Sequence, residues 1–178
     1  MWQCLLNQQH KRKVALIINK IQKTLKILWK YLCIFWFCGL TYALMEILVR
    51  GRSAYEMVIL AGICGVICLA PFNNFTSYNT DFLFQSISCG TICTFLEWIC
   101  GVFFNKNHQI WDYSTLPLST PDGQINFFFW ILWCVLAALA IPILDYIEYH
   151  CFDYKPETPP YYKIFGKVVF QMKPKKKE

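Results

Sequence analysis

Charged residues are scarce in this chain, and that scarcity excludes most soluble folds. Asp, Glu, Lys and Arg make up only 16% of the 178 residues, whereas hydrophobic residues make up 56% and aromatic residues 18%. A typical soluble chain carries roughly 25% charged residues. A soluble domain of this size could not keep so much apolar surface away from water, because too large a share of a small fold is surface. The composition therefore indicates an integral membrane protein.

Sequence motifs of common ATPases and hydrolases are also missing. The chain contains no phosphate-binding loop (G-x-x-x-x-G-K-[ST]), no zinc-protease H-E-x-x-H pair and no G-x-S-x-G nucleophile elbow. We therefore expect no enzymatic activity and no cofactor, and this chain cannot power transport with ATP through such a loop. A membrane enzyme is the third-ranked class, because no nucleophile–base pair is evident.

Cysteine is abundant, but histidine is scarce and poorly placed for a metal site. Most of the ten cysteines lie inside apolar runs, where a cysteine behaves as a small apolar residue. Cys89 and Cys93 are one helical turn apart and could ligate a soft metal. No histidine accompanies them, because all three histidines fall outside the apolar runs. We expect mostly free thiols that pack between helices, and no metal site.

The apolar residues fall into four long runs. A hydrocarbon core of ~30 Å needs about 20 apolar residues per helix. We therefore predict an all-α, polytopic integral membrane protein with a four-helix membrane domain over residues 27–149. The four transmembrane helices are expected at about residues 27–49, 54–72, 82–104 and 125–146.

Both ends of the chain are basic. Residues 1–26 carry apolar residues at helical spacing with lysines on other faces, which predicts an amphipathic helix on the membrane surface. The alternative is a flexible tail followed by the start of the first span. No cleavable signal peptide is evident, because the first apolar stretch follows a long basic arm. Residues 150–178 are rich in Pro, Tyr and Lys, and we expect them to be mostly disordered.

The distribution of Lys and Arg predicts the orientation. Seven of the 17 basic residues precede or open the first span, seven follow the fourth, and three lie in the first and third connections. The positive-inside rule then places both termini in the cytoplasm of a multi-pass cell-membrane protein. The Lys-rich ends are expected to contact anionic lipid headgroups. A nucleic-acid partner is not expected, because no recognition motif accompanies the charge.

Two carboxylates inside predicted spans are the first candidates for a functional site. An acidic residue near a helix centre is disfavoured by roughly 2.5–3.5 kcal/mol on insertion scales. At 1.5 Å per residue, Glu97 lies ~10 Å and Glu46 ~5 Å below the outer boundary, so both fall in one layer. They could share a proton, bind a cation or contact a polar substrate. Alternatively, Glu46 is an interfacial side chain that reaches water, and Glu97 makes a structural hydrogen bond.

The third connection, residues 105–124, lies on the same side as these carboxylates. Trp111 and Tyr113 are rings suited to a membrane interface, Asp112 can cap a turn, and Gly123 supplies a turn of its own. The connection is long enough to fold back over the carboxylate layer. We therefore include these four residues with Glu46 and Glu97 in a predicted substrate-binding or proton-linked site. Alternatively, both rings are ordinary interface residues.

A series of motifs between Thr94 and Trp133, which includes Glu97-Trp98 and Trp111-Asp112-Tyr113-Ser114, resembles the Putative ABC-transporter type IV family. The resemblance covers about residues 34–146 and includes a first-span glutamate, Glu46. The chain departs from the family pattern in two places. The Asn-Arg-Gly-Phe stretch that usually follows the first glutamate is reduced here to Arg50-Gly51-Arg52. The asparagine that usually follows the Trp-Asp-Tyr-Ser motif is replaced within Leu118-Ser119-Thr120. The similarity is specific over Thr94-Phe-Leu-Glu97-Trp98, Gly101, Trp111-Asp112-Tyr113-Ser114, Leu116-Pro117, Gly123-Gln-Ile125, Trp130 and Trp133.

The resemblance implies a membrane transport protein or a permease-like subunit, whose substrate the sequence does not give. A separate ATPase subunit is an expected partner, and four spans form a thin bundle, so a homo-oligomer is expected if the chain transports anything. The alternative is a structural or regulatory membrane protein in which the same residues only hold the bundle together.

Overall fold

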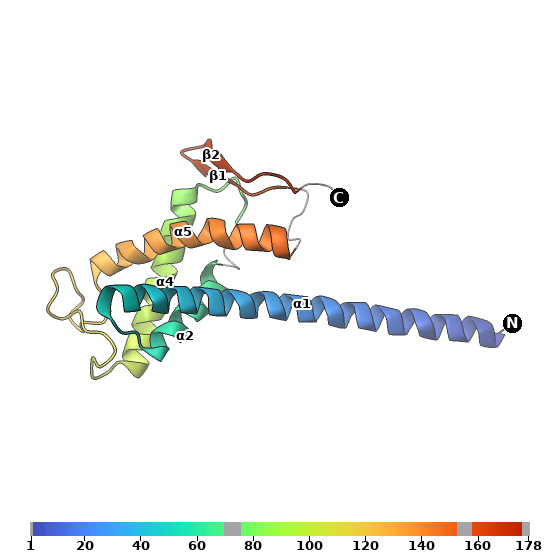
Figure 1. Cartoon of the computed structure of the whole chain (residues 1–178), viewed down its shortest axis with the longest axis horizontal. Coiled ribbons are helices and arrows are strands. Elements are labelled where there is room, and N and C mark those ends of the chain that lie inside the picture. The colour runs from blue at the N-terminus through green and yellow to red at the C-terminus, as the bar shows by residue number, and fades with distance from the viewer. Residues whose placement is uncertain (1, 70–75, 153–157, 176–178) are drawn as a thin grey trace. The chain divides into compact units, whose positions relative to one another are not determined.

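A computed structural model describes residues 2–69, 76–152 and 158–175 of the chain (Figure 1). Helices dominate these residues, and a short pair of strands follows them. In chain order the elements are α1 (Trp2–Arg50), α2 (Tyr55–Cys64), the π-helical turn η1 (Gly65–Leu69), α4 (Phe82–Phe104), α5 (Phe127–Cys151), β1 (Tyr161–Ile164) and β2 (Lys167–Gln171).

Contacts divide the chain into two units, Met1–Cys33 and Ile34–Glu178. The described residues of the first unit are helical and form the N-terminal part of α1. A helix thus occupies the region where the sequence predicted one, but its amphipathic role on a membrane surface stays a prediction. The second unit contains the rest of α1 and all the other elements.

Three helices in the described residues are long and apolar enough to cross a membrane: Arg12–Arg50, Phe82–Phe104 and Phe127–Cys151. The second of these has the bounds that the sequence predicted for its third span. The predicted second span, at 54–72, corresponds to a shorter apolar helix, Tyr55–Ile67, and residues 70–72 lie outside the described residues. Within residues 2–69, 76–152 and 158–175 there are thus three candidate spans where four were predicted, and the fourth stays a proposal.

Helices α4 and α5 are packed backbone to backbone. A Cβ atom on Gly90 of α4 would lie 2.6 Å from both the backbone nitrogen and the Cα of Cys134 in α5, so only glycine allows this approach. Side-chain caps fix where both helices begin: Asp81 accepts a hydrogen bond from the backbone N–H of Leu83, and Asn126 accepts one from Phe128. The α4–α5 pair is therefore the structural centre of the second unit.

The C-terminal segment contains a β-hairpin that the sequence reading missed. We predicted an all-α fold and a mostly disordered tail, but β1 and β2 pair antiparallel, with Tyr162 opposite Phe170 and Ile164 opposite Lys167. The strands are rich in aromatic and β-branched residues, which favour strands, and glycine occupies the turn. Their lysines and the nearby prolines resemble the composition of a disordered tail, which hid this pattern.

The hairpin lies against the beginning of α4 and the end of α5. The Tyr162 hydroxyl donates to Asp145 of α5 at 2.6 Å, and the Tyr162 ring packs edge-on against Phe82 of α4. Burial, together with the Asp145 carboxylate, raises the pKa of Tyr162. Asp145 and Glu148, near the end of α5, are only 3% and 1% exposed. The start of α4, the end of α5 and the hairpin thus share one side of the second unit, here called the hairpin side.

Candidate functional site

The carboxylate of Glu97 is the most buried acidic group among the predicted site residues, at 1% exposure. Its Oε1 atom accepts a hydrogen bond from the Tyr113 hydroxyl at 3.0 Å, and its Oε2 atom accepts one from the indole nitrogen of Trp133 at 2.8 Å. Three segments therefore meet at this carboxylate: α4 supplies Glu97, the 105–124 connection supplies Tyr113, and α5 supplies Trp133. Two donors offset part of the cost of keeping an acidic group away from water.

Aromatic rings surround the hydrogen-bonded carboxylate. Tyr42 of α1 stacks on Trp133 with ring centroids 5.4 Å apart and planes 11° apart, and Tyr113 stacks on Phe129 at 4.4 Å. Burial raises the pKa of the Tyr113 phenol, and the Glu97 carboxylate raises it further, so Tyr113 remains a hydrogen-bond donor at neutral pH. The rings fix the direction of both donors that reach Glu97.

A second buried network holds the 105–124 connection above the helices. The Asn105 side chain, at the end of α4, donates to the Trp111 carbonyl at 2.6 Å and to the Gln124 side chain at 3.2 Å. Gln124 donates back to the Asn105 carbonyl, and the Trp111 indole donates to the Gln124 carbonyl at 3.1 Å. Gly101 makes room for Gln124, because a Cβ there would lie 2.4 Å from its Oε1 atom. Trp111 therefore positions the connection, and Tyr113, two residues later, makes the hydrogen bond to Glu97.

Asp112 and Gly123 shape the same connection without touching Glu97. Asp112 is exposed and accepts a hydrogen bond from the Ser114 backbone at 2.9 Å; hydrogen bonds from Ser114 lower the pKa of this carboxyl. Gly123 has a φ of +63° and its carbonyl accepts from the Tyr113 backbone at 3.0 Å. A side chain at Gly123 would be strained in that conformation. Both residues thus stabilise the turn that presents Tyr113.

Asp122 links the 105–124 connection to α4 through an exposed hydrogen bond. Its carboxylate accepts hydrogen bonds from the Thr120 hydroxyl and, at 3.1 Å, from the indole nitrogen of Trp98, which lies one residue after Glu97. The Thr120 hydrogen bond is the main cause of a lowered pKa for this carboxyl, and Trp98 adds to it.

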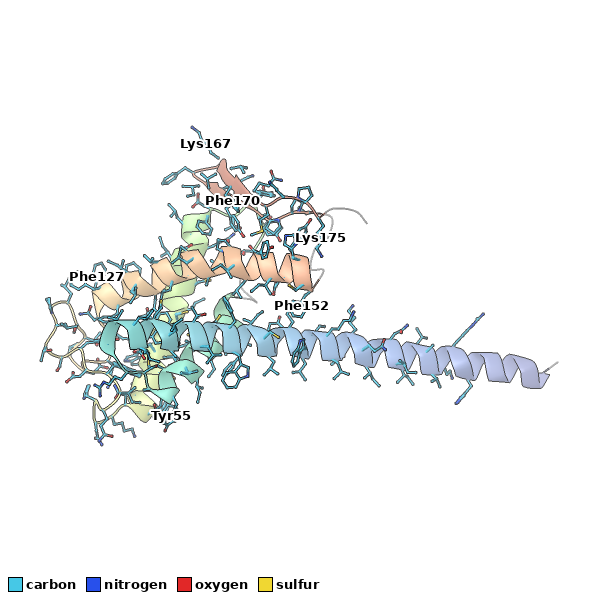
Figure 2. The ribbon with its side chains drawn as sticks, in the orientation of Figure 1. Tyr55, Phe127, Phe152, Lys167, Phe170 and Lys175 are labelled. Atoms are coloured by element: carbon cyan, nitrogen blue, oxygen red, sulfur yellow. The ribbon has the colours of Figure 1, made fainter. Side chains whose placement is uncertain are left out.

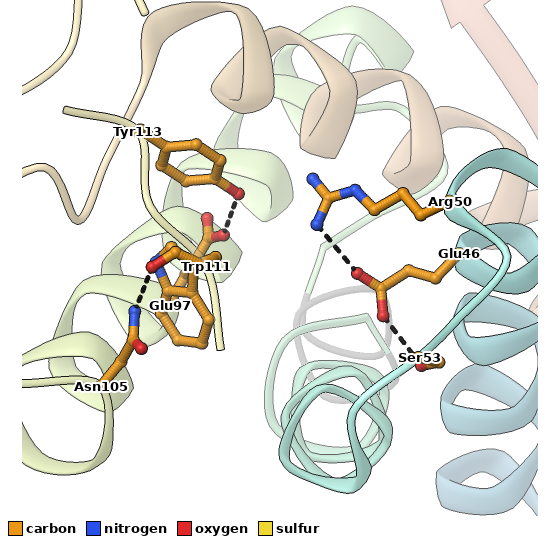
Figure 3. Close-up of polar contacts among 7 residues, drawn as sticks. All are labelled: Glu46, Arg50, Ser53, Glu97, Asn105, Trp111 and Tyr113. Atoms are coloured by element: carbon orange, nitrogen blue, oxygen red, sulfur yellow. Dashed lines mark hydrogen bonds and ion pairs between the residues drawn. The ribbon is translucent and has the colours of Figure 1, made fainter. Parts of the chain in front are cut away.

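Glu46 lies at the end of α1 and has partners of its own (Figure 3). Its carboxylate accepts from the Ser53 hydroxyl at 2.8 Å and pairs with Arg50, one helical turn later, at 3.5 Å. Figure 3 shows the Arg50 side chain extending from α1 toward the region of Tyr113. A pocket of about 300 Å³ adjoins this pair and is lined by Glu46, Arg50, Arg52, Ser53, Ala54, Glu56, Gln109 and Ile110.

An apolar cavity of about 210 Å³ lies beside the Tyr42–Trp133 stack. Both stacked rings form part of its wall, so the same indole faces the cavity and donates to Glu97. All four helices contribute to the lining, which includes Cys38, Thr41, Met45, Ala61, Cys64, Cys93, Leu136, Ala137 and Ala140.

The structure brings some of the predicted site residues together and separates others. Glu97 and Tyr113 are in direct contact, and Trp111 lies in the network just above them. Glu46 lies on the same side of the second unit as the 105–124 connection, but its carboxylate accepts hydrogen bonds from Arg50 and Ser53. Asp112 and Gly123 act on the turn. Of the cysteines whose side chains the structure describes, none forms a disulfide, and Cys89 and Cys93 are buried.

Sequence reasoning missed several members of the site. Trp133 was noted only as part of a motif, because nothing local shows that α5 turns this indole toward Glu97. Asn105 and Gln124 are amide residues at the two ends of the 105–124 connection. Near the end of a helix, a side-chain amide often hydrogen-bonds backbone groups that have no partner within the helix. That signal could have identified them. Arg50 was counted only for its charge.

A comparison with known families now bears on this geometry. The model of the family described as Putative ABC-transporter type IV matches residues 56–172, which is more than half of the chain. The chain belongs to this family. The suspected family is thereby confirmed, and the match extends through the hairpin, beyond the residues that suggested the resemblance. No curated protein and no solved structure matches the chain.

Membership of this family, together with the apolar helices, identifies a membrane transport-related protein. The matched residues include Glu97, the whole 105–124 connection and Trp133. Glu46 lies before the first matched residue, so its assignment as the family's first-span glutamate stays a prediction.

Proposed function

We propose that this chain is the permease-like subunit of a membrane transporter and that Glu97 is the central residue of its transport site. The observation that carries the proposal is the buried Glu97 carboxylate, held by donors from two other segments beneath a folded connection. A carboxylate at this depth in an apolar helix is costly and marks functional positions in membrane proteins. A separate subunit would hydrolyse ATP, because this chain has no phosphate-binding loop.

The surroundings of Glu97 support a passage for a polar or charged substrate. The polar pocket beside Glu46 and Arg50 lies on the side of the 105–124 connection, and the apolar cavity lies beyond the Tyr42–Trp133 stack. Trp133, which donates to Glu97, forms part of the wall of the apolar cavity. In this proposal a substrate enters the polar pocket and displaces Tyr113 or Trp133 from Glu97.

A fourth membrane crossing, predicted at about residues 54–72, belongs to the same proposal. Ala54 lines the polar pocket on the side of the 105–124 connection, whereas Asn79 accepts a hydrogen bond from Tyr161 on the hairpin side. The positions of Ala54 and Asn79 on opposite sides of the second unit support a crossing between them. An even number of crossings places both termini on one side, and the lysine distribution favours the cytoplasm.

A structural or regulatory role is the second candidate function. It is favoured by the fact that both Glu97 oxygens accept hydrogen bonds from within the chain, as in a residue that only joins helices. In that case the α4 carboxylate would contribute to stability and to nothing else.

Affinity purification from mildly solubilised membranes, followed by mass spectrometry, tests the proposed function. We expect an ATP-hydrolysing subunit to be recovered with the wild-type chain. If repeated purifications recover no such subunit, the permease-subunit proposal is wrong.

The recovered complex then tests the site through its ATPase activity in lipid vesicles. Glu97→Gln should retain the partner but lose most of the ATPase activity that the wild-type chain supports, because the carboxylate charge is gone. Lys106→Gln is the control, since it removes an exposed charge from the 105–124 connection, near the end of α4. Wild-type activity in the Glu97→Gln complex would leave the structural role as the better explanation.

A further inference from the structure

The tip of the C-terminal hairpin, residues 164–167, has an unusual turn. Phe165 has a φ of +49° and Gly166 a φ of +78°. Tight hairpin turns with two such residues favour Asn, Asp or Gly, and a bulky side chain in that conformation is strained. Phe165 is 85% exposed, so burial within the chain does not offset the strain. A strained, exposed aromatic residue suggests a contact outside the chain.

The tip lies at the level where a candidate membrane span begins. The backbone N–H of Phe165 donates to the Asp81 carboxylate at 2.6 Å, and Asp81 is the N-cap of α4, whose first residue is Phe82. Lys163 donates to Asn79, two residues before the cap, at 2.6 Å. Helix α4 is long and apolar enough to cross a bilayer. In a bilayer-spanning α4, these hydrogen bonds would hold the tip near the boundary between headgroups and hydrocarbon.

The hairpin combines exposed apolar residues with positive charge. Residues 158–175 contain four lysines and no acidic residue. Lys167 is exposed next to the turn, and Figure 2 shows it projecting from the ribbon at the end of the hairpin. The apolar residues of β2 are more than half exposed: Val168, Val169 and Phe170. Aromatic rings prefer the membrane interface, and lysines bind anionic headgroups.

We infer that the hairpin tip is an interfacial anchor: Phe165 inserts into the bilayer at the level of Asp81, and Lys167 binds anionic lipid headgroups of the same leaflet. A protein partner could also use an exposed strand. The membrane is favoured because the tip is fastened to the cap of a spanning helix and because its charge is of one sign. The inference depends on α4 crossing the bilayer and is independent of the proposed transport site.

Photo-crosslinking in nanodiscs tests the anchor with the full chain. p-Benzoylphenylalanine replaces Phe165, and the protein is reconstituted in phosphatidylcholine alone or mixed with phosphatidylglycerol. We expect lipid adducts at position 165 in both, with a higher yield in the anionic discs. The same reagent in place of Phe84, an exposed residue of α4, is the positive control because a spanning helix contacts lipid regardless of charge.

The electrostatic part is tested by Lys167→Gln in the same experiment. Removing one lysine near an anionic surface should lower the excess yield in anionic discs about fivefold. Two outcomes overturn the anchor: protein adducts at position 165 in place of lipid adducts, which would indicate a docking surface, or no lipid adduct while position 84 reacts. An unchanged yield in Lys167→Gln would overturn the role given to Lys167.

Discussion

Replacing Glu97 by alanine should destabilise the fold far more than replacing it by glutamine. In the wild-type chain the carboxylate accepts hydrogen bonds from Tyr113 at 3.0 Å and from Trp133 at 2.8 Å. Alanine leaves both donors buried without their acceptor, which costs about 1–3 kcal/mol for each. The free energy of unfolding should therefore fall by about 2–6 kcal/mol.

Glutamine can satisfy both neighbours, but only in one orientation. An indole N–H can only donate, so the amide oxygen must face Trp133 and the amide nitrogen must face Tyr113, whose hydroxyl can rotate to accept. That arrangement loses only the additional strength of hydrogen bonds to a charged acceptor, about 1 kcal/mol. Glu97→Gln thus removes the charge and largely preserves the packing.

Thermal unfolding in detergent, followed by near-ultraviolet circular dichroism, measures the difference. For chains of 150–250 residues, 1 kcal/mol shifts Tm by about 2–4 °C. The alanine variant should melt at least about 4 °C below the wild type, with the glutamine variant between the two. Equal losses in the two variants, or no loss for alanine, would show that Tyr113 and Trp133 do not hold the Glu97 carboxylate in the folded protein.

Three further predictions concern other parts of the second unit. Gly90→Ala should lower the free energy of unfolding by about 1–3 kcal/mol, because the new Cβ would meet backbone atoms of Cys134 that cannot move aside. Gly62→Ala is the control and should cost less, because its Cβ would meet only an aromatic side chain. Thermal unfolding measures both. Because the pKa of Asp122 is lowered, its ionised carboxylate contributes to stability above the ordinary carboxyl pKa of 3.8, and this contribution is lost as the pH falls further. The Tm of the wild type should therefore drop more steeply in acid than the Tm of Asp122→Asn. Tyr162→Phe removes the hydroxyl that joins the hairpin to α5, so backbone amides of the hairpin should exchange faster with deuterium while those of α4 are unchanged.

The long helices could be predicted from the sequence because their limits are local. Helix α4 is a mostly apolar segment between Asp81, whose side chain caps it, and Asn105, which ends it. The region after Ala54 is different: a regular helix changes to a π-helical turn at Gly65, and apolarity alone does not reveal where such a change occurs. The hairpin was missed because its strands are short and depend on contacts with Asp81 and Asp145, which are distant in sequence.

The depth of the site could be predicted, but its partners could not. Counting residues from the end of a helix at 1.5 Å each placed Glu97 below the 105–124 connection, and Tyr113 of that connection does contact it. Counting does not give the direction in which a side chain points around the helix. Trp133, 36 residues away on α5, was therefore beyond the reach of the same reasoning.

The two carboxylates also differ in how far local interactions explain them. Glu46 has a salt bridge to Arg50 one turn later and a hydrogen bond from Ser53, and it borders a pocket, so a charged side chain at the end of α1 needs no distant partner. An exposed pair of this kind contributes only about 0–1 kcal/mol. Glu97 is buried, and both of its hydrogen bonds come from segments that only the folded bundle brings near. The free-energy cost of burying the Glu97 carboxylate can be offset only by the tertiary structure, so its presence requires a functional or a structural reason. Glu97→Gln, which keeps the packing, and Glu97→Ala, which does not, separate these two reasons.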